Sequence, residues 1–285
     1  MAILFGILTA CTNAFAVTTQ HIASTSSTSQ RGWHLIAYLF RHPLWLLGWI
    51  GLIGSLVFQA FALHFGTLSS VQPVLLTELV FALVLRRFWL RQDIRRPTWI
   101  AALATCVLLS IFLASSAPRG VPTSPTREKW IVMLVVVGVI LLTSVVLGQS
   151  GSPSRRAASL SFATSVSWAV EACFIKAATD SFNPGGIAGA LSRWPIYAFA
   201  IGGLLGLLLE QWTLHVGPLK VSLPILVIVD PIVSVILGVG IFAEHFEAGT
   251  LRLVLGIVAF VAMCATTFVM TQTTPIDMTG EVRKI

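Results

Sequence analysis

Charged residues are scarce in this chain. Only 10% of its 285 residues are Asp, Glu, Lys or Arg, while 56% are apolar. In typical soluble domains, about a quarter of all residues are charged. This scarcity excludes a soluble protein with an ordinary water-facing surface. The charges also gather in short clusters, and the apolar runs between them have about the 20 residues that cross a bilayer core of about 30 Å. The pattern predicts an all-α, polytopic membrane protein.

Cysteines and catalytic motifs are also sparse. The four cysteines lie singly in separate apolar runs, which excludes a C-x-x-C metal knuckle and a disulfide scaffold. The sequence has no Gly-rich phosphate loop, no H-E-x-x-H, no metal-binding His pair and no pattern for a Ser/His/Asp set. We therefore expect no enzyme activity and no resident cofactor.

The apolar runs predict nine membrane-spanning helices. β-Strands are excluded, because the runs are about twice the length of a membrane strand and lack apolar/polar alternation. No Lys or Arg precedes the first run, so we interpret it as a retained span rather than a signal peptide. No soluble domain fits between the runs, and residues 1–285 are expected to form one integral membrane domain. The runs are 2–22, 44–64, 68–91, 97–117, 129–148, 157–178, 194–214, 218–242 and 250–272.

The basic residues orient these helices. The formal net charge is +7, but the Lys and Arg residues lie beside apolar spans, so we attribute them to the positive-inside rule and expect no nucleic-acid partner. Twelve of the 18 lie on one side of the nine spans and five on the other. This predicts a protein of the cell (plasma) membrane with its N-terminus outside and residues 273–285 as a cytoplasmic tail.

The chain contains an internal repeat. A shift of 151 residues aligns segment 62–68 with 213–219, and ten of the 35 positions between residues 50 and 84 are then identical. The shift maps span 2 onto span 7, a displacement of five helices, so the two copies point in opposite directions. Inverted repeats are typical of secondary transporters. We expect a first repeat at 1–117 (spans 1–4), an intervening span 5 at 129–148, and a second repeat at 157–272 (spans 6–9).

The repeat pairs two proline-containing spans. Pro73 in span 3 aligns with Pro224 in span 8, and Asp93 aligns with Glu244. A proline inside a helix removes one backbone hydrogen bond and leaves a carbonyl free to face a cavity. Because the two prolines occupy matching positions, we interpret them as functional breaks rather than as simple kinks.

These residues resemble a known family. The unit from Phe61 to Pro73, continued to Asp93, and its second copy from Trp212 to Glu244 resemble the drug/metabolite transporter superfamily of EamA-like proteins. Nine spans, an outside N-terminus and Lys176 late in span 6 resemble its NIPA-type magnesium-transporter branch. The first half departs from the usual Leu-x-Glu ending, since it reads Leu-Arg-Gln-Asp there. The resemblance implies a membrane transporter that works by alternating access.

Four carboxylates fall inside the spans: Glu78, Glu171, Glu210 and Asp230. An acid at the centre of a membrane helix costs about 3 kcal/mol on insertion scales, so it normally faces the protein interior, a partner or water. Asp230 precedes Pro231, an arrangement that predicts a half-helix restarting there in span 8; alternatively, Asp230 only caps that break.

Other polar residues extend this candidate site. Trp168 shares a helix face with Glu171. Lys176 either reaches the outer interface or pairs with a carboxylate on another span. Asn13, the main polar group of the first span, serves either as a link between helices or as a cavity wall. Glu210 lies nearer a helix end, where water reaches it.

The favoured hypothesis is a carrier whose small solute sits between spans 1, 3, 6 and 8. An organic cation, amphipathic drug or metabolite fits a carboxylate next to Trp168. Alternatively, Mg²⁺ fits oxygen ligands from Glu78, Glu171 and Asp230, as in a divalent-cation transporter.

A hypothesis from a different function class is a non-transporting scaffold or accessory subunit. The partners expected are the lipid bilayer and the solute, with a homodimer left open. The substrate-binding residues are predicted to be Asn13, Gln72, Glu78, Trp168, Glu171 and Asp230, and the coupling or gating residues Lys176, Glu210, Pro73 and Pro224.

Overall fold

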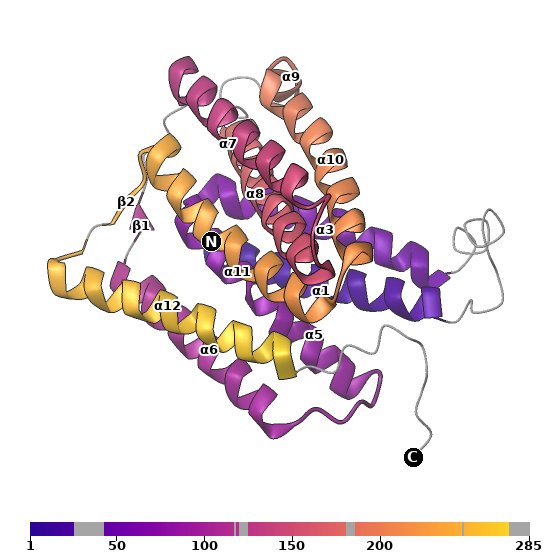
Figure 1. Cartoon of the computed structure of the whole chain (residues 1–285). Coiled ribbons are helices and arrows are strands. Elements are labelled where there is room, and N and C mark those ends of the chain that lie inside the picture. Colours follow the sequence, from indigo (N-terminus) through magenta and orange to yellow (C-terminus); the bar gives the residue numbers. More distant parts are fainter. Residues whose placement is uncertain (26–42, 117, 120–124, 181–185, 247, 274–285) are drawn as a thin grey trace.

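The computed structural model describes residues 1–25, 43–116, 118–119, 125–180, 186–246 and 248–273. In this part of the chain nine helical segments are long and apolar enough to cross a membrane, which confirms the predicted all-α, polytopic fold class (Figure 1). The helices are α1 (Ala2–Thr25), α3 (Pro43–Phe65), α4 (Leu68–Leu75), α5 (Thr77–Phe88), α6 (Arg96–Ser116), α7 (Arg127–Leu147), α8 (Pro153–Asp180), α9 (Gly186–Leu191), α10 (Trp194–Val216), α11 (Leu219–Phe242) and α12 (Thr250–Thr273).

The observed helix ends lie within a few residues of the predicted spans. The largest difference is in α8, which begins four residues earlier than expected and continues to Asp180. Three short elements were not predicted: α9 and the strands β1 (Pro118–Arg119) and β2 (His245–Phe246), which pair antiparallel. Elements of two to six residues are too short to leave a periodic signal. The predicted cytoplasmic tail, beyond its first residue, lies outside the described residues.

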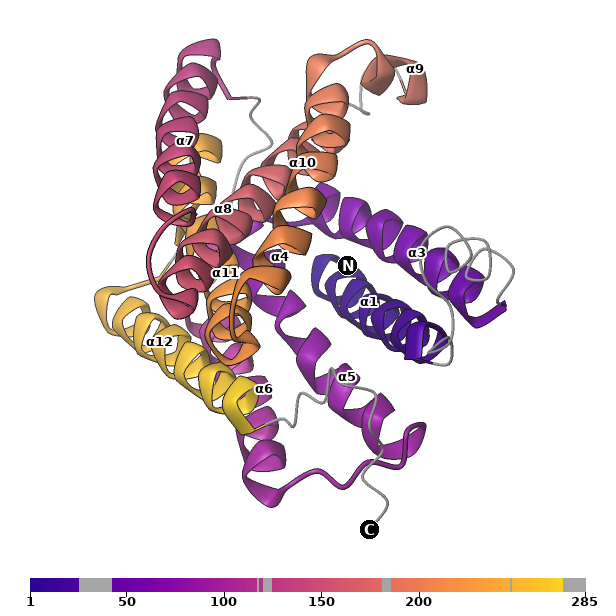
Figure 2. The ribbon, with the colours of Figure 1, turned by 45° about the vertical axis from the view of Figure 1, so that its right-hand side comes forward.

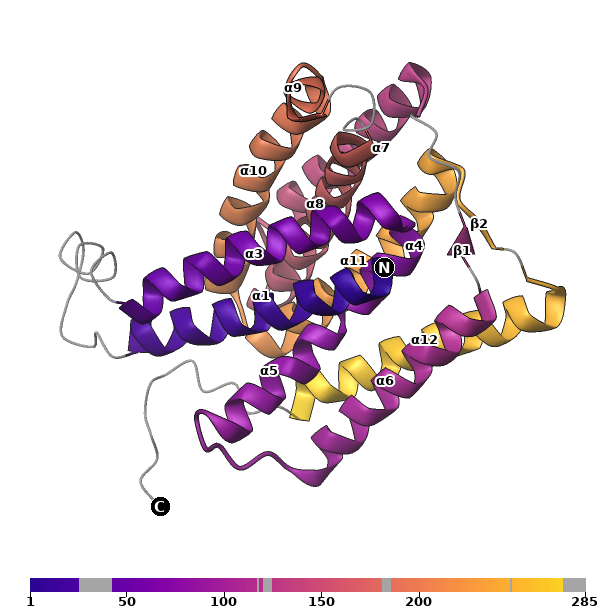
Figure 3. The same cartoon turned by 180° about the vertical axis from the view of Figure 1, so that it is seen from behind.

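The helices pack in a pattern that recurs along the chain. α1 packs against α3 and α5, and α8 packs in the same way against α10 and α11 (Figure 2). α6 lies along α12, and α4 packs on α11 (Figure 3). The bounds of α3, moved by 151 residues, are those of α10. Helices 151 residues apart therefore have matching neighbours, and α7 lies between the two sets along the chain.

Helix α8 is at the centre of this arrangement. In the most apolar 18-residue stretch of α8, 72% is buried inside the protein, whereas the corresponding share for α10 is 11%. Its small residues allow the close packing, since Ala163, Ala169 and Cys173 are fully buried. The outer helices instead expose large apolar side chains such as Leu251, as a surface in contact with lipid requires.

The two proline-containing spans differ. Span 3 is interrupted at Leu76, three residues after Pro73, and forms the separate helices α4 and α5, so a break is confirmed there. In span 8, α11 runs without interruption through Pro224 and Pro231, so the predicted half-helix restarting at Asp230 is wrong.

A neighbouring helix supplies a partner for the backbone of α11 at Pro224. The carbonyl of Lys220, which Pro224 leaves without its usual donor, accepts a hydrogen bond from Gln272 Nε2 at 2.7 Å. The Ser165 hydroxyl on α8, which lies 2.9 Å from the Ser161 carbonyl of its own helix, also approaches the α11 carbonyls of Ile225 and Leu226 at 3.2 and 3.3 Å. A helix whose free carbonyls are bonded from outside can accommodate proline without separating into halves.

Candidate functional site

The four membrane-embedded carboxyl groups converge from four helices. Glu78 of α5 interacts electrostatically with Glu210 of α10, and Glu171 of α8 interacts with both Glu210 and Asp230 of α11. We call these four residues the carboxylate cluster. Each is surrounded by protein, yet Glu78, Glu210 and Asp230 keep some accessible surface. The cluster therefore lies inside the bundle rather than on its lipid-facing surface.

Glu171 is the most enclosed member of the cluster. Its side chain is buried, and its Oε2 atom has no hydrogen-bond partner. A glycine of α10 makes room for it, because a Cβ at Gly203 would lie 2.7 Å from Glu171 Oε1. A buried carboxylate oxygen without a donor is costly, so Glu171 is left without full hydrogen-bonding inside the bundle.

Polar neighbours hold the other carboxyl groups. Asn13 Nδ2 on α1 donates to Glu78 Oε2 at 2.8 Å, so Asn13 both links α1 to α5 and lies beside the cluster. The Ser234 hydroxyl donates to Asp230 Oδ1 at 3.1 Å, one turn along the same helix. Each of these two carboxyl groups keeps further oxygen lone pairs that such a single donor does not satisfy.

Two further predicted binding residues differ in their relation to the cluster: Trp168 lies beside it, and Gln72 does not bond to it. The Trp168 indole lies close to the Glu210 carboxyl group, and its ring packs against Gly206 of α10. Gln72 is buried in α4, but its Nε2 atom has no partner, so it donates to none of the cluster carboxyls. Trp168 therefore lies beside a cluster carboxyl group, whereas Gln72 does not bond to one.

Positive charges and metal-ligand geometry are both missing around the cluster, as far as the structure describes the chain. No described Lys or Arg forms an ion pair with any of the four carboxyl groups. Among the same residues, no three His, Cys, Asp or Glu side chains are close enough to share a metal ion. Glu78, Glu171 and Asp230 therefore do not form a set of direct ligands to one ion in this conformation.

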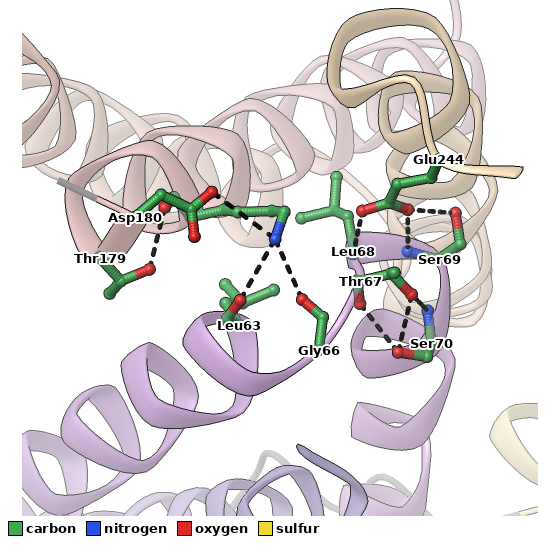
Figure 4. A network of polar contacts seen from close by, with 10 residues as sticks. Leu63, Gly66, Thr67, Leu68, Ser69, Ser70, Thr179, Asp180 and Glu244 are labelled. Carbon is green, nitrogen blue, oxygen red and sulfur yellow. Dashed lines mark hydrogen bonds and ion pairs between the residues drawn. The ribbon is translucent and has the colours of Figure 1, made fainter. Parts of the chain in front are cut away.

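Lys176 lies at a different place from the cluster, at the end of α8. Its Nζ atom donates to the carbonyls of Leu63 and Gly66, at 3.3 and 3.0 Å, and pairs with Asp180 at 3.8 Å (Figure 4). Both predictions for Lys176 are wrong: the side chain is buried rather than extended to the interface, and its carboxylate partner is on its own helix. The reason is that α8 continues one turn beyond Lys176 and so places an acid beside it.

Glu244, in the loop after α11, binds the beginning of α4. Its carboxylate accepts hydrogen bonds from Leu68 N at 2.6 Å, Ser69 N at 2.9 Å and Ser69 Oγ at 2.7 Å (Figure 4). A cation thus meets the carbonyl end of α3 and an anion meets the amide end of α4, the signs that helix dipoles favour. We call Lys176, Glu244 and the link 65–68 between α3 and α4 the outer clamp, since the charge pattern predicts that this end faces outside.

Sequence patterns offered one indication of the outer clamp. The shift of 151 residues pairs Glu244 with Asp93, which marks both residues without indicating a partner. The Asp93 side chain is exposed and bonds to Arg87 Nη1 at 2.6 Å, within its own half of the chain. The contact from Glu244 to α4 joins residues about 175 positions apart, a distance over which local patterns predict nothing.

Comparison with known proteins reveals one related full-length chain. This chain is 29% identical over 276 residues to a protein of Corynebacterium glutamicum described as uncharacterized, and the alignment covers 96% of this chain and 95% of that protein. No protein-family model matches the chain, and no solved structure matches it. The similarity therefore extends along nearly the whole of both chains, and the description of the relative carries no activity over to this chain.

Proposed function

We propose that the protein is a membrane carrier that moves a small organic cation by alternating access. The observation that carries this proposal is the carboxylate cluster: four acids from four helices lie inside the bundle, near enough to interact electrostatically, with no described Lys or Arg paired to them. Such a site lacks positive charge, which a cationic solute supplies. The matching neighbours of helices 151 residues apart support two repeats that rock against each other.

The outer clamp gives this carrier a way to close one end. Lys176 and Glu244 both belong to the second repeat, and both bind the link between α3 and α4 in the first. These contacts hold the two repeats together at the outer end. The aligned acid at the other end, Asp93, stays within the first repeat. We therefore assign this conformation to a state that is closed at the outer end.

Trp168 favours an organic cation over a hydrated metal ion. Its ring lies beside Glu210 and on the same helix face as Glu171, and a tryptophan face attracts organic ammonium groups. Mg²⁺ remains the second candidate solute, because it keeps most of its water and needs only one or two carboxylates. The absence of a shared metal-ligand group among the described residues favours the organic cation.

Transport assays in liposomes test this proposal. We expect Glu78→Gln, Glu171→Gln and Asp230→Asn to abolish uptake of the fluorescent organic cation ethidium, because each change removes one negative charge from the cluster. Glu128→Gln is the matched control, since Glu128 is an exposed carboxylate in the first turn of α7. Uptake of Mg²⁺, measured in parallel with an entrapped indicator dye, distinguishes the two solutes, because Trp168→Leu is expected to impair only the organic cation.

Folding must be followed in the same variants. Thermal unfolding in detergent should show all of them folded, since a loss of folding without a specific loss of flux is the outcome that a scaffold or accessory subunit predicts. Full ethidium and Mg²⁺ flux in all three cluster variants would contradict the proposed site. Mg²⁺ flux that depends on the cluster, with no ethidium flux, would instead identify the divalent-cation carrier.

A further inference from the structure

A pocket with basic and aromatic walls lies at the predicted outer end of the bundle, away from the carboxylate cluster. It has a volume of about 850 Å³ and lies between the beginnings of α7 and α10 and the end of α8. Figure 1 shows these two helix beginnings at the same end of the molecule. Its walls include Arg127, Arg193, Trp130, Trp194 and Asp180.

The pocket carries excess positive charge. Arg127 and Arg193 are both exposed, and neither forms an ion pair with another described residue. The single acid in the lining, Asp180, is already paired with Lys176. Arg193 is also the N-cap residue of α10 and makes no side-chain capping bond there, so the positive end of that helix adds to the charge of the two arginines. An anionic ligand suits this pocket.

The rest of the lining is aromatic and apolar. Trp130 and Trp194 meet edge to face, with ring centroids 4.9 Å apart. Ile131 and Leu134, one turn apart on α7, also line the pocket, and their exposed fractions of 50% and 43% place them on the lipid-facing side of that helix. A free inorganic anion makes no use of such a wall. A molecule with an anionic head and a hydrocarbon chain contacts both parts.

We propose that this pocket binds the headgroup of an anionic phospholipid, with Arg127 and Arg193 donating to its phosphate and an acyl chain following Ile131 and Leu134. Guanidinium groups donate paired hydrogen bonds to phosphate oxygens, and tryptophan rings favour the headgroup level of a bilayer. The predicted topology places the lipid in the outer leaflet. The proposal does not depend on transport, because the pocket shares no residue with the carboxylate cluster.

Lipid binding by the purified full-length protein tests this site. We expect native mass spectrometry to show more retained phosphatidylglycerol than phosphatidylcholine. The double variant Arg127→Gln/Arg193→Gln should weaken phosphatidylglycerol binding by about tenfold or more, since two charge-assisted contacts are lost. Arg95→Gln/Arg96→Gln is the matched control, because both arginines are exposed and Arg96 begins α6 as Arg127 begins α7. It should retain wild-type binding.

Two further measurements separate lipid from free anion and from misfolding. Leu134→Ser should weaken phosphatidylglycerol binding, and inorganic phosphate at millimolar concentration should fail to displace the lipid. Thermal unfolding without added lipid should be equal in all variants, because the substituted side chains are exposed. Equal retention of the two lipids, equal losses in the two arginine double variants, or full displacement by phosphate would overturn the proposal.

Discussion

The link between α3 and α4 and the link between α10 and α11 occupy aligned positions in the two repeats, but they are held differently. Their glycines behave alike: a Cβ at Gly66 would lie 2.5 Å from Ala2, and one at Gly217 would lie 2.8 Å from Ala157. In each repeat, therefore, the link packs closely on the beginning of the first helix, α1 or α8. This part of the structure follows the repeat.

The charged contacts at the two links do not follow the repeat. At the link between α3 and α4, which we call the outer link, Glu244 caps α4, and Lys176 donates to the carbonyls of Leu63 and Gly66. At the link between α10 and α11, which we call the inner link, α11 begins after Pro218 without a side-chain cap. Asp93, which aligns with Glu244, bonds to Arg87 instead. The two links thus pack alike, whereas the charged contacts of Glu244 and Lys176 are present only at the link between α3 and α4. This difference between two copies of one sequence pattern supports the alternating-access carrier that we propose.

The largest expected difference is between Glu244→Gln and Asp93→Asn. Glu244 is 3% exposed and accepts three hydrogen bonds, and glutamine replaces one accepting oxygen with a donor that faces backbone N–H groups. We expect the free energy of unfolding to fall by about 2–3 kcal/mol. Asp93→Asn should cause no measurable change, because its pair with Arg87 is at the surface. Denaturant or thermal unfolding in detergent measures both, and equal effects would contradict the assigned difference between the two ends.

Much of the fold was predictable because it depends on composition and length. The nine spans, the break after Pro73 and the membrane position of the four acids follow from apolar runs and single residues read locally. The repeat register aligns Gly66 with Gly217, and both glycines pack closely on the beginning of a first helix. These features require no knowledge of which helices touch.

The remaining features depend on contacts between distant segments. Asp230 and Pro231 together form a local signal for a helix start, yet α11 continues through them, and at Pro224 the freed carbonyl of Lys220 finds its donor, Gln272, on another helix. Lys176 pairs with Asp180 on its own helix and donates to the carbonyls of Leu63 at the end of α3 and Gly66 in the following link. The convergence of Glu78 with Glu210 likewise depends on how α5 and α10 pack, which no single span encodes.

A glycine substitution sharpens the comparison at the outer link. A Cβ at Gly238 would overlap the Glu244 carboxylate and lie 2.8 Å from Ser69 Oγ, whereas a Cβ at Gly240 would meet nothing within 4 Å. Gly238→Ala should therefore destabilise the protein by about 1–2 kcal/mol, because the capping carboxylate must move. Gly240→Ala, on the same helix, should be neutral or stabilise by up to about 1 kcal/mol. If thermal unfolding shows that the two variants are equally stable, the clamp at Glu244 is not tightly packed.

The smallest expected effect concerns the inner end, where Gln272 of α12 bonds to the Lys220 carbonyl that Pro224 leaves free. Gln272→Leu should lower the free energy of unfolding by about 0.5–1 kcal/mol, since the bond is exposed and neutral. In a Pro224→Ala background the restored N–H of residue 224 takes the same carbonyl, so the loss should become smaller than in the wild type. A double-mutant cycle by thermal unfolding measures this coupling. Identical losses in both backgrounds would mean that the continuity of α11 does not depend on this bond, and that the difference between the two proline-containing spans has another cause.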